Sequence, residues 1–245
     1  MLRLRTLRAL GAMDAGSLLA DPLLCWMAAL PLVVALAVRT SLPLVIAKVG
    51  ALAEVSLAWI EPLLSGYVVV TMAPLLAGAV VGFLLLDQRD DRTLLALRVT
   101  PLPLGAYIAY RLAVPTVVAL ATTLAAIATA GGLGLSPLSA LLAALASAPL
   151  APVVALALAT FARNKLQGMA LMKAANVLLI APLAALFLPP IWQLPLQLVP
   201  TYQVAQATWA LQAGEPVWTS LAASWVLAVV LVALLLWRLR RTLGG

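Results

Sequence analysis

The sequence predicts an all-α integral membrane protein, and three observations lead to that class. First, 65% of the residues are hydrophobic and only 9% are charged, whereas about a quarter of the residues of a soluble domain carry a charge. Second, the mean hydropathy is +1.13. Third, stretches of about 20 apolar residues recur, each long enough to cross a hydrocarbon core roughly 30 Å thick. The ten-residue alternation of membrane β-strands is not visible, so the spanning segments are expected to be helices.

The 245 residues are expected to form a single transmembrane domain with six spanning helices. The predicted spans are 23–39, 63–86, 106–130, 137–162, 172–190 and 217–237. The sequence "GGLGLSP" predicts a tight turn between the third and fourth spans. Prolines inside spans remove a backbone donor and kink the helix, which neighbouring helices in a bundle tolerate. These prolines are Pro74, Pro115, Pro149, Pro152 and Pro182.

The distribution of basic residues predicts the orientation. Six spans put both termini on the same side of the membrane, and every Lys and Arg except Arg39 and Lys48 falls on that side. Because Lys and Arg accumulate in cytoplasmic loops, both termini are expected in the cytoplasm. The same bias accounts for the pI of about 10.3, so no nucleic-acid partner is expected.

The segment 42–60 is a rival for a seventh span. It contains Lys48 and Glu54, and it leaves no room for a turn before the span that starts at Leu63. Counting it as a span would also invert the charge distribution of everything downstream. We therefore expect an extracytoplasmic helix that lies on the interface or dips into it.

Residues 1–21 precede the first span and are expected to contain an amphipathic interfacial helix. Within 2–13, three leucines and Met13 fall on one broad helical arc, with Arg5 and Arg8 opposite, as in helices that lie along a membrane surface. Asp14 departs from this pattern. A solvated basic tail is the alternative. The length of the segment before the apolar run disfavours a cleaved signal peptide.

The chain lacks the residues that many enzymes and ion-driven pumps need. It contains no histidine and a single cysteine, Cys25, which excludes histidine catalysis, an internal disulfide and a thiolate cluster for a metal. It has no G-x-x-x-x-G-K-[ST] nucleotide motif. Its acidic residues lie at the ends of spans and in loops, whereas ion-coupled transporters usually need carboxylates near the membrane midplane. No catalytic, cofactor or metal site is predicted, and energy for any transport would come from a partner.

The most informative local signal is "DQRDDRTLLALRVTPLP", between the second and third spans. The carboxylates of Asp90 and Asp91 can cap a short helix and complement its dipole. Leu94 and Leu97 give that helix an apolar side, and Pro101 helps to end it. The pattern predicts a short, capped helix that could insert into a groove on another protein. An ordinary polar loop is the alternative.

Acidic residues followed by T-L-x-x-L and T-P-L after the second span resemble the permease subunits of type-2 ABC exporters. The resemblance implies that 87–105 is the coupling helix, which docks on a separate ATPase subunit. The residues expected to carry the coupling are Asp87, Arg89, Asp90, Asp91, Arg92, Thr93, Leu94, Leu97, Thr100 and Pro101. The family usually has a glycine where this chain has Arg92.

The stretch "ARNKLQGMALMKAAN" (162–176) is similar to the second cytoplasmic connection of the fluoroquinolone-export-permease-like branch of that family. The branch carries a lysine, a glycine three residues later and a further lysine that leads into the fifth span. The matching residues here are Lys165, Gly168 and Lys173.

The stretch 188–215 is similar to the extracytoplasmic segment of the same branch. In the wider family this region forms short re-entrant helices that help to close the outer side of the pathway. Pro200, Thr201 and Tyr202 would belong to that outer gate. Several prolines in this stretch forbid one continuous helix.

Together, the resemblance implies the membrane subunit of an ATP-driven exporter in a prokaryotic inner membrane. Its partners would be membrane lipid, a second permease copy or homologue, and an ABC ATPase subunit that carries ATP and Mg²⁺. The sparsely charged interior suits a hydrophobic or amphipathic solute, a drug or a lipid. The alternative is a non-transporting membrane scaffold or enzyme that uses 87–105 as a docking site, and the missing catalytic groups disfavour the enzyme.

Overall fold

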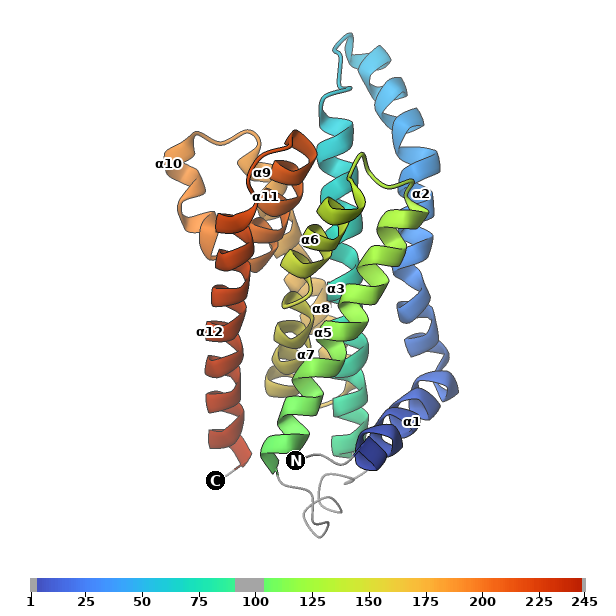
Figure 1. The fold of residues 1–245 in the computed structure, drawn as a ribbon, viewed down its shortest axis with the longest axis vertical. Helices are drawn as coiled ribbons and strands as arrows, with labels where there is room; N and C mark the ends of the chain where they lie inside the picture. The colour runs from blue at the N-terminus through green and yellow to red at the C-terminus, as the bar shows by residue number, and fades with distance from the viewer. Residues whose placement is uncertain (1–3, 91–103, 244–245) are drawn as a thin grey trace.

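The computed structural model describes residues 4–90 and 104–243, and the regular elements in these ranges are helices (Figure 1). Within them, six helical stretches are long and apolar enough to cross a bilayer. They are Pro22–Ala53, Ile60–Gln88, Tyr107–Thr129, Pro137–Phe161, Lys165–Ala185 and Trp218–Leu239. The prediction of an all-α, multi-pass membrane protein with six spanning helices is therefore confirmed.

Helix α1 (Leu4–Ala20) lies at an angle to the spanning helices, at the end of the bundle where α12 also ends (Figure 1). We call this end the α1 end. Asp21 separates α1 from α2 (Pro22–Ala53), and its carboxylate accepts a hydrogen bond from the backbone N–H of Leu23 at 2.8 Å. This cap satisfies a donor that the first turn of a helix leaves without a partner. The interfacial position of α1 remains a prediction.

Helix α2 is longer than expected. It continues through Pro43 to Ala53, so the prediction of a separate helix over 42–60 was wrong. Helix α2 tolerates Pro43, because a proline inside a helix removes one donor without having to end the helix. Residues 54–59 form the turn to α3 for which that prediction found no room. At 1.5 Å per residue, α2 is about 48 Å long, which exceeds a bilayer core of roughly 30 Å.

The outer part of α2 projects beyond the rest of the bundle (Figure 1). Arg39 donates to the carbonyl of Thr129, the last residue of α5 (Leu104–Thr129), at 3.4 Å. The last turns of α2 therefore lie past the end of α5. They are joined to α3 (Ile60–Asp90), which runs back through the centre of the molecule.

The predicted turn between the third and fourth spans is confirmed. It joins α5 to α6 (Pro137–Ser147), which Ser136 caps by accepting from the backbone N–H of Ser139 at 3.1 Å. Gly131 and Gly132 have φ angles of 86° and 85°, which glycine adopts without steric cost.

The fourth span consists of two helices, α6 and α7 (Leu150–Phe161). The break lies at Ala148 and Pro149, because Pro149 has no N–H to donate to the helix ladder. The two helices remain nearly end to end and together form one span (Figure 1).

The fifth span is assembled from three pieces: α8 (Lys165–Ala175), a 3₁₀ turn (Asn176–Leu179) and α9 (Ile180–Ala185). It begins at Lys165 rather than at 172, because the side chain of Asn164 accepts from the backbone N–H of Gln167 at 2.9 Å and caps a helix there. The predicted second loop is therefore mostly helix.

Between the fifth and sixth spans, prolines break the chain into short elements, as predicted. They are α10 (Pro190–Gln193), a 3₁₀ turn (Pro195–Leu198) and α11 (Pro200–Ala213). Helix α11 packs back into the bundle, where the indole N–H of Trp209 donates to the carbonyl of Leu63 at 2.9 Å. Helix α12 (Trp218–Leu243) completes the fold.

Helices α3 and α7 form the centre of the protein. In the most apolar part of α3, 72% of the residues are buried, against 11% in α12. Gly78 and Gly82 of α3 face α7, and a Cβ atom at Gly82 would lie 2.7 Å from Cδ1 of Leu158. Small residues at helix interfaces let the backbones approach closely, which strengthens packing inside a membrane.

Candidate functional site

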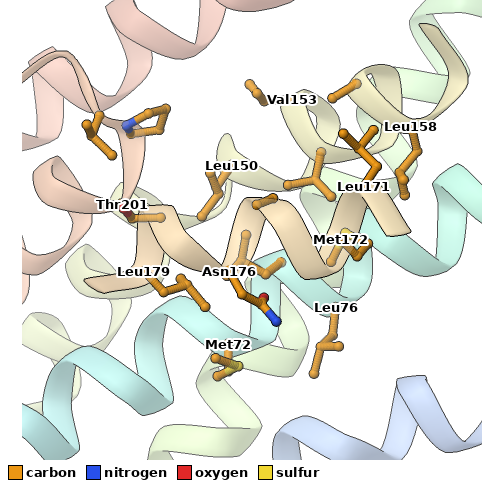
Figure 2. A pocket seen from close by; sticks show the side chains of 16 residues that line it. Met72, Leu76, Leu150, Val153, Leu158, Leu171, Met172, Asn176, Leu179 and Thr201 are labelled. Carbon is orange, nitrogen blue, oxygen red and sulfur yellow. The ribbon is translucent and has the colours of Figure 1, made fainter. Parts of the chain in front are cut away.

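A cavity of about 190 Å³ lies between α3, α7, the fifth span and the start of α11. Its wall is almost entirely apolar, with Leu and Val side chains and two methionines (Figure 2). The labelled residues in Figure 2 are Met72, Leu76, Leu150, Val153, Leu158, Leu171, Met172, Asn176, Leu179 and Thr201. Such a wall suits a solute with an apolar body.

Two polar side chains interrupt this wall. Asn176 stands where α8 gives way to the 3₁₀ turn, and Thr201 stands in the first turn of α11. The Asn176 side chain is exposed, whereas Thr201 is buried. A carboxamide both donates and accepts hydrogen bonds, so Asn176 can orient a solute that otherwise makes only apolar contacts.

The three predicted gate residues lie at one side of the cavity. Pro200 and Thr201 line it, while Tyr202 is buried beside them at 4% exposure. The Tyr202 hydroxyl donates to Oε1 of Gln193 at 3.2 Å and accepts from Nε2 of Gln206 at 3.0 Å. The bond to Gln193 links α11 to α10, and the bond from Gln206 lies within α11. The role of the three residues as a gate remains a prediction.

A buried polar cluster, the Asp14 cluster, ties α1 to the spanning helices. Nη1 of Arg111 lies 3.1 Å from Oδ2 of Asp14, and the Arg111 side chain is only 5% exposed. The Tyr110 hydroxyl donates to the same oxygen at 3.0 Å. Gln88 donates to Oδ1 of Asp14 at 3.2 Å and accepts from Nη2 of Arg111. The end of α3 and the beginning of α5 are therefore both bound to α1 through Asp14.

A second group, the Lys165 cluster, lies at the same end. Nζ of Lys165 donates to Oδ2 of Asp21 at 2.5 Å and to Oδ2 of Asp87 at 2.9 Å. It thus joins the start of α8 to the cap of α2 and the last turns of α3. The hydrogen bond from Lys165 lowers the pKa of the Asp21 carboxyl below its usual value, and the backbone bonds from Leu23 and Leu24 add to this.

Only part of the predicted coupling set can be placed. Asp87 belongs to the Lys165 cluster, and Arg89 and Asp90 lie in the last turn of α3. The remaining predicted residues lie outside the described residues. They are Asp91, Arg92, Thr93, Leu94, Leu97, Thr100 and Pro101.

The residues predicted in the second loop lie apart from one another on α8. Lys165 forms the cluster described above. Gly168 packs on α3, where an added Cβ would lie 2.8 Å from Cε1 of Phe83. Lys173 is exposed in the last turn of α8. The sequence by itself had not predicted Asp14, Arg111 or Asn176 as site residues. The one available signal was Asp14, an acid that breaks an amphipathic pattern.

The fold and site define a multi-pass membrane protein, with an apolar cavity inside the bundle and ion pairs gathered at the α1 end. A family model described as "Fluoroquinolones export permease protein Rv2686c-like" matches residues 14–236. The chain belongs to this family. The predicted resemblance to this branch is therefore confirmed.

Two curated relatives are the fluoroquinolones export permease proteins MT2760 and Rv2686c of Mycobacterium tuberculosis strains CDC 1551 and H37Rv. Each is 31% identical to this chain over 238 residues, which cover 96% of this chain and 94% of the relative. No solved structure matches the chain. The family and the relatives place the chain among export permeases, that is, among transport proteins.

Proposed function

We propose that this chain is the membrane-spanning permease subunit of an ATP-driven exporter. It moves a hydrophobic or amphipathic solute, a drug or a lipid, outward when a separate ATPase subunit drives it. The observation that carries the proposal is the apolar cavity between α3, α7 and the fifth span, with the Asn176 carboxamide in its wall. The names of the relatives support a drug as the solute.

The size of the cavity indicates how transport would proceed. Pockets that enclose drug-sized ligands usually have volumes of about 300–1,000 Å³, and this cavity measures about 190 Å³. It must widen to take up a whole solute. The fifth span is the wall that can move most readily, because only 18% of the residues in its most apolar part are buried.

The Lys165 cluster offers a route from the partner to this wall. Asp87 stands at the start of the segment on which we propose the ABC ATPase docks, and Lys165 begins the fifth span. Closure of the ATPase around ATP and Mg²⁺ would move the 87–105 segment, and the ion pair would pass this movement to α8. The distribution of Lys and Arg supports cytoplasmic termini in a prokaryotic inner membrane, with a second permease copy or homologue completing the assembly.

A cavity-filling substitution tests the proposal. The permease and its ATPase are reconstituted in vesicles, and ATP-dependent movement of a fluorescent fluoroquinolone is measured. Met172→Trp, which fills the cavity, is expected to reduce transport at least tenfold. Met169→Trp is the matched control, because Met169 lies on the same helix but is exposed, and it should transport within about twofold of the unmodified protein.

Equal transport by the two variants would show that the cavity is not part of the transport pathway. A stable complex with the ATPase that moves no tested solute would instead favour the membrane scaffold.

A further inference from the structure

A second groove, of about 430 Å³, lies between α7 and α12 toward the α1 end. Leu231, Leu234 and Leu235 of α12 line its apolar part. Phe161, the last residue of α7, and Arg238 lie at its mouth, beside Trp237. It opens toward the outside of the bundle, so in a bilayer it faces the acyl chains of lipids.

Aromatic rings hold arginines at this mouth. The guanidinium carbon of Arg238 lies 4.9 Å from the ring centre of Phe161, which joins α12 to α7 across the groove. The guanidinium carbon of Arg241 lies 3.8 Å from the ring centre of Trp237. Cation–π contacts of this kind orient an arginine without neutralising its charge. Arg163, in the short connection after α7, is exposed and adds to the positive charge of this region.

The groove is therefore apolar along its length and positive at its mouth. The sequence contains no Asp or Glu between residues 92 and 214 or after 215, so neither α7 nor α12 contains a carboxylate that would repel a phosphate. The stretch from Leu231 to Arg238 rises about 10 Å along a helix, enough for the upper part of an acyl chain. Arginine binds phosphate through paired N–H donors, and tryptophan prefers the level of lipid headgroups.

We propose that this groove binds an anionic phospholipid from the leaflet at the α1 end. One acyl chain lies along the α12 leucines, and the headgroup phosphate binds Arg238 and Arg241. Basic pockets between spanning helices bind anionic lipid headgroups by this combination of charge and apolar surface. The groove adjoins the solute cavity along α7, where Val153 and Ala157 line both. The choice of a lipid over a second copy rests in part on the proposed docking of the ATPase.

Charge complementarity favours a lipid over a second copy of the chain. A second copy would have to bring carboxylates to the arginines. At the α1 end, Asp14 is already bound to Arg111, and Asp21 and Asp87 are already bound to Lys165. The remaining acids on that side, Asp90 and Asp91, belong to the segment proposed to dock on the ATPase. An anionic phospholipid carries its phosphate at the level of the arginines and needs no carboxylate of a second chain.

Native mass spectrometry of the purified permease tests this proposal without the ATPase. The protein is mixed with equal amounts of phosphatidylglycerol and phosphatidylcholine, and the retained lipid adducts are counted. The unmodified protein is expected to prefer phosphatidylglycerol. Each arginine near the membrane contributes about fivefold to such a preference, so R238Q/R241Q should reduce it by roughly tenfold or more. K48Q, a charge-matched control at the opposite end, should leave it unchanged.

A second variant tests the acyl-chain part of the groove. L234W, at an exposed leucine, should reduce the retention of both lipids while leaving the arginines intact. Thermal unfolding in phosphatidylcholine checks that each variant is folded, and the single variant R241Q replaces the double variant if that one is not. An unchanged preference for phosphatidylglycerol in the folded arginine variant would overturn the proposal. A loss of dimer without a change in lipid preference would also overturn it, in favour of a second copy.

Discussion

At the scale of single residues, Asp14 has the most consequential position. It is one of the few acidic residues in the chain, and it is placed where Arg111, Tyr110 and Gln88 all reach its carboxylate. Burying an ion pair is costly unless the remaining donors and acceptors are satisfied. Here they are satisfied by residues on α3 and α5, so the pair holds α1 in a defined place against the spanning helices.

Removal of Asp14 should therefore be strongly destabilising. Asp14→Ala leaves the Arg111 guanidinium buried without its counter-ion, which costs about 3–5 kcal/mol of unfolding free energy in comparable buried pairs. The double variant Asp14→Ala/Arg111→Met should recover much of this loss, because it removes both charges. Thermal or denaturant unfolding in detergent measures both. If the double variant is no more stable than the single one, the two residues are not coupled as the structure indicates.

Asp21 should make stability depend on pH in the acidic range. Its pKa is lowered in the folded protein by the hydrogen bond from Lys165, so its contribution is fully present above the unfolded pKa of about 3.9. The contribution is lost as the pH falls through the lower, folded pKa. Unfolding measured between about pH 2.5 and 7 should show Asp21→Asn less stable than the unmodified protein at pH 7. The gap should narrow below about pH 4, and a gap that stays constant would contradict this assignment.

At the scale of helices, packing between α3 and α7 depends on glycine. Gly78 and Gly82 bring α3 close to α7 on the same side, since residues four apart share a helix face. The fifth span contrasts with this contact, because it touches the centre closely at Gly168 and is separated from it further along by the cavity. In the proposed transport cycle, the tightly packed α3–α7 pair would stay fixed while the loosely packed fifth span moves.

Gly82→Ala tests the tight contact. The added Cβ would lie 2.7 Å from Cδ1 and 2.9 Å from Cβ of Leu158, so the helices must separate, at a cost of about 1–3 kcal/mol. Gly16→Ala on α1 is the matched control, because no heavy atom lies within 4 Å of its added Cβ. That change should be neutral or stabilise the protein by up to about 1 kcal/mol. Equal melting temperatures for the two variants would show that the α3–α7 contact tolerates separation.

At the scale of the whole molecule, the projecting α2–α3 turn and the clusters at the α1 end lie at opposite ends (Figure 1). The distribution of Lys and Arg predicts that the turn faces outward and the clusters face the cytoplasm. The orientation can be measured by labelling introduced cysteines, because the chain has a single native cysteine, Cys25, to replace first.

Cysteine labelling checks this orientation. In a Cys25→Ser background, Ser56→Cys, in the turn after α2, should react with a membrane-impermeant maleimide in intact cells. Arg163→Cys, between α7 and α8, should react only after the cells are permeabilised. The reverse pattern would mean that the basic residues face outward and that the proposed docking side is wrong.

Much of the fold could be predicted, because the signals for it are local. A run of about 20 apolar residues favours the bilayer whatever its neighbours are, so four of the six predicted spans correspond closely to the spanning segments of the structure. Prolines marked the breaks before α7 and α11. The two errors also have local causes. Helix α2 runs past Arg39 to Ala53, and the cap at Asn164 starts the fifth span early. Proline and capping residues shift helix ends without changing the number of spans.

The candidate site was less predictable. The sequence indicated Lys165 and Thr201 as residues of interest, but it did not indicate that Lys165 pairs with Asp21 and Asp87, or that Thr201 and Asn176 share a cavity. Asp14 and Arg111 are almost a hundred residues apart in the chain. Such pairings depend on which helix faces meet, and hydropathy carries no information about that.

The sequence by itself therefore determined the membrane class and the number of spans, because both follow from transfer of short segments from water to lipid. Only the tertiary structure decided the length of α2, the ion pairs that bind α1, and the position of the cavity between α3, α7 and the fifth span. These depend on close contacts between distant segments, where a glycine at Gly82 or a carboxylate at Asp14 acquires its role from the partner it meets.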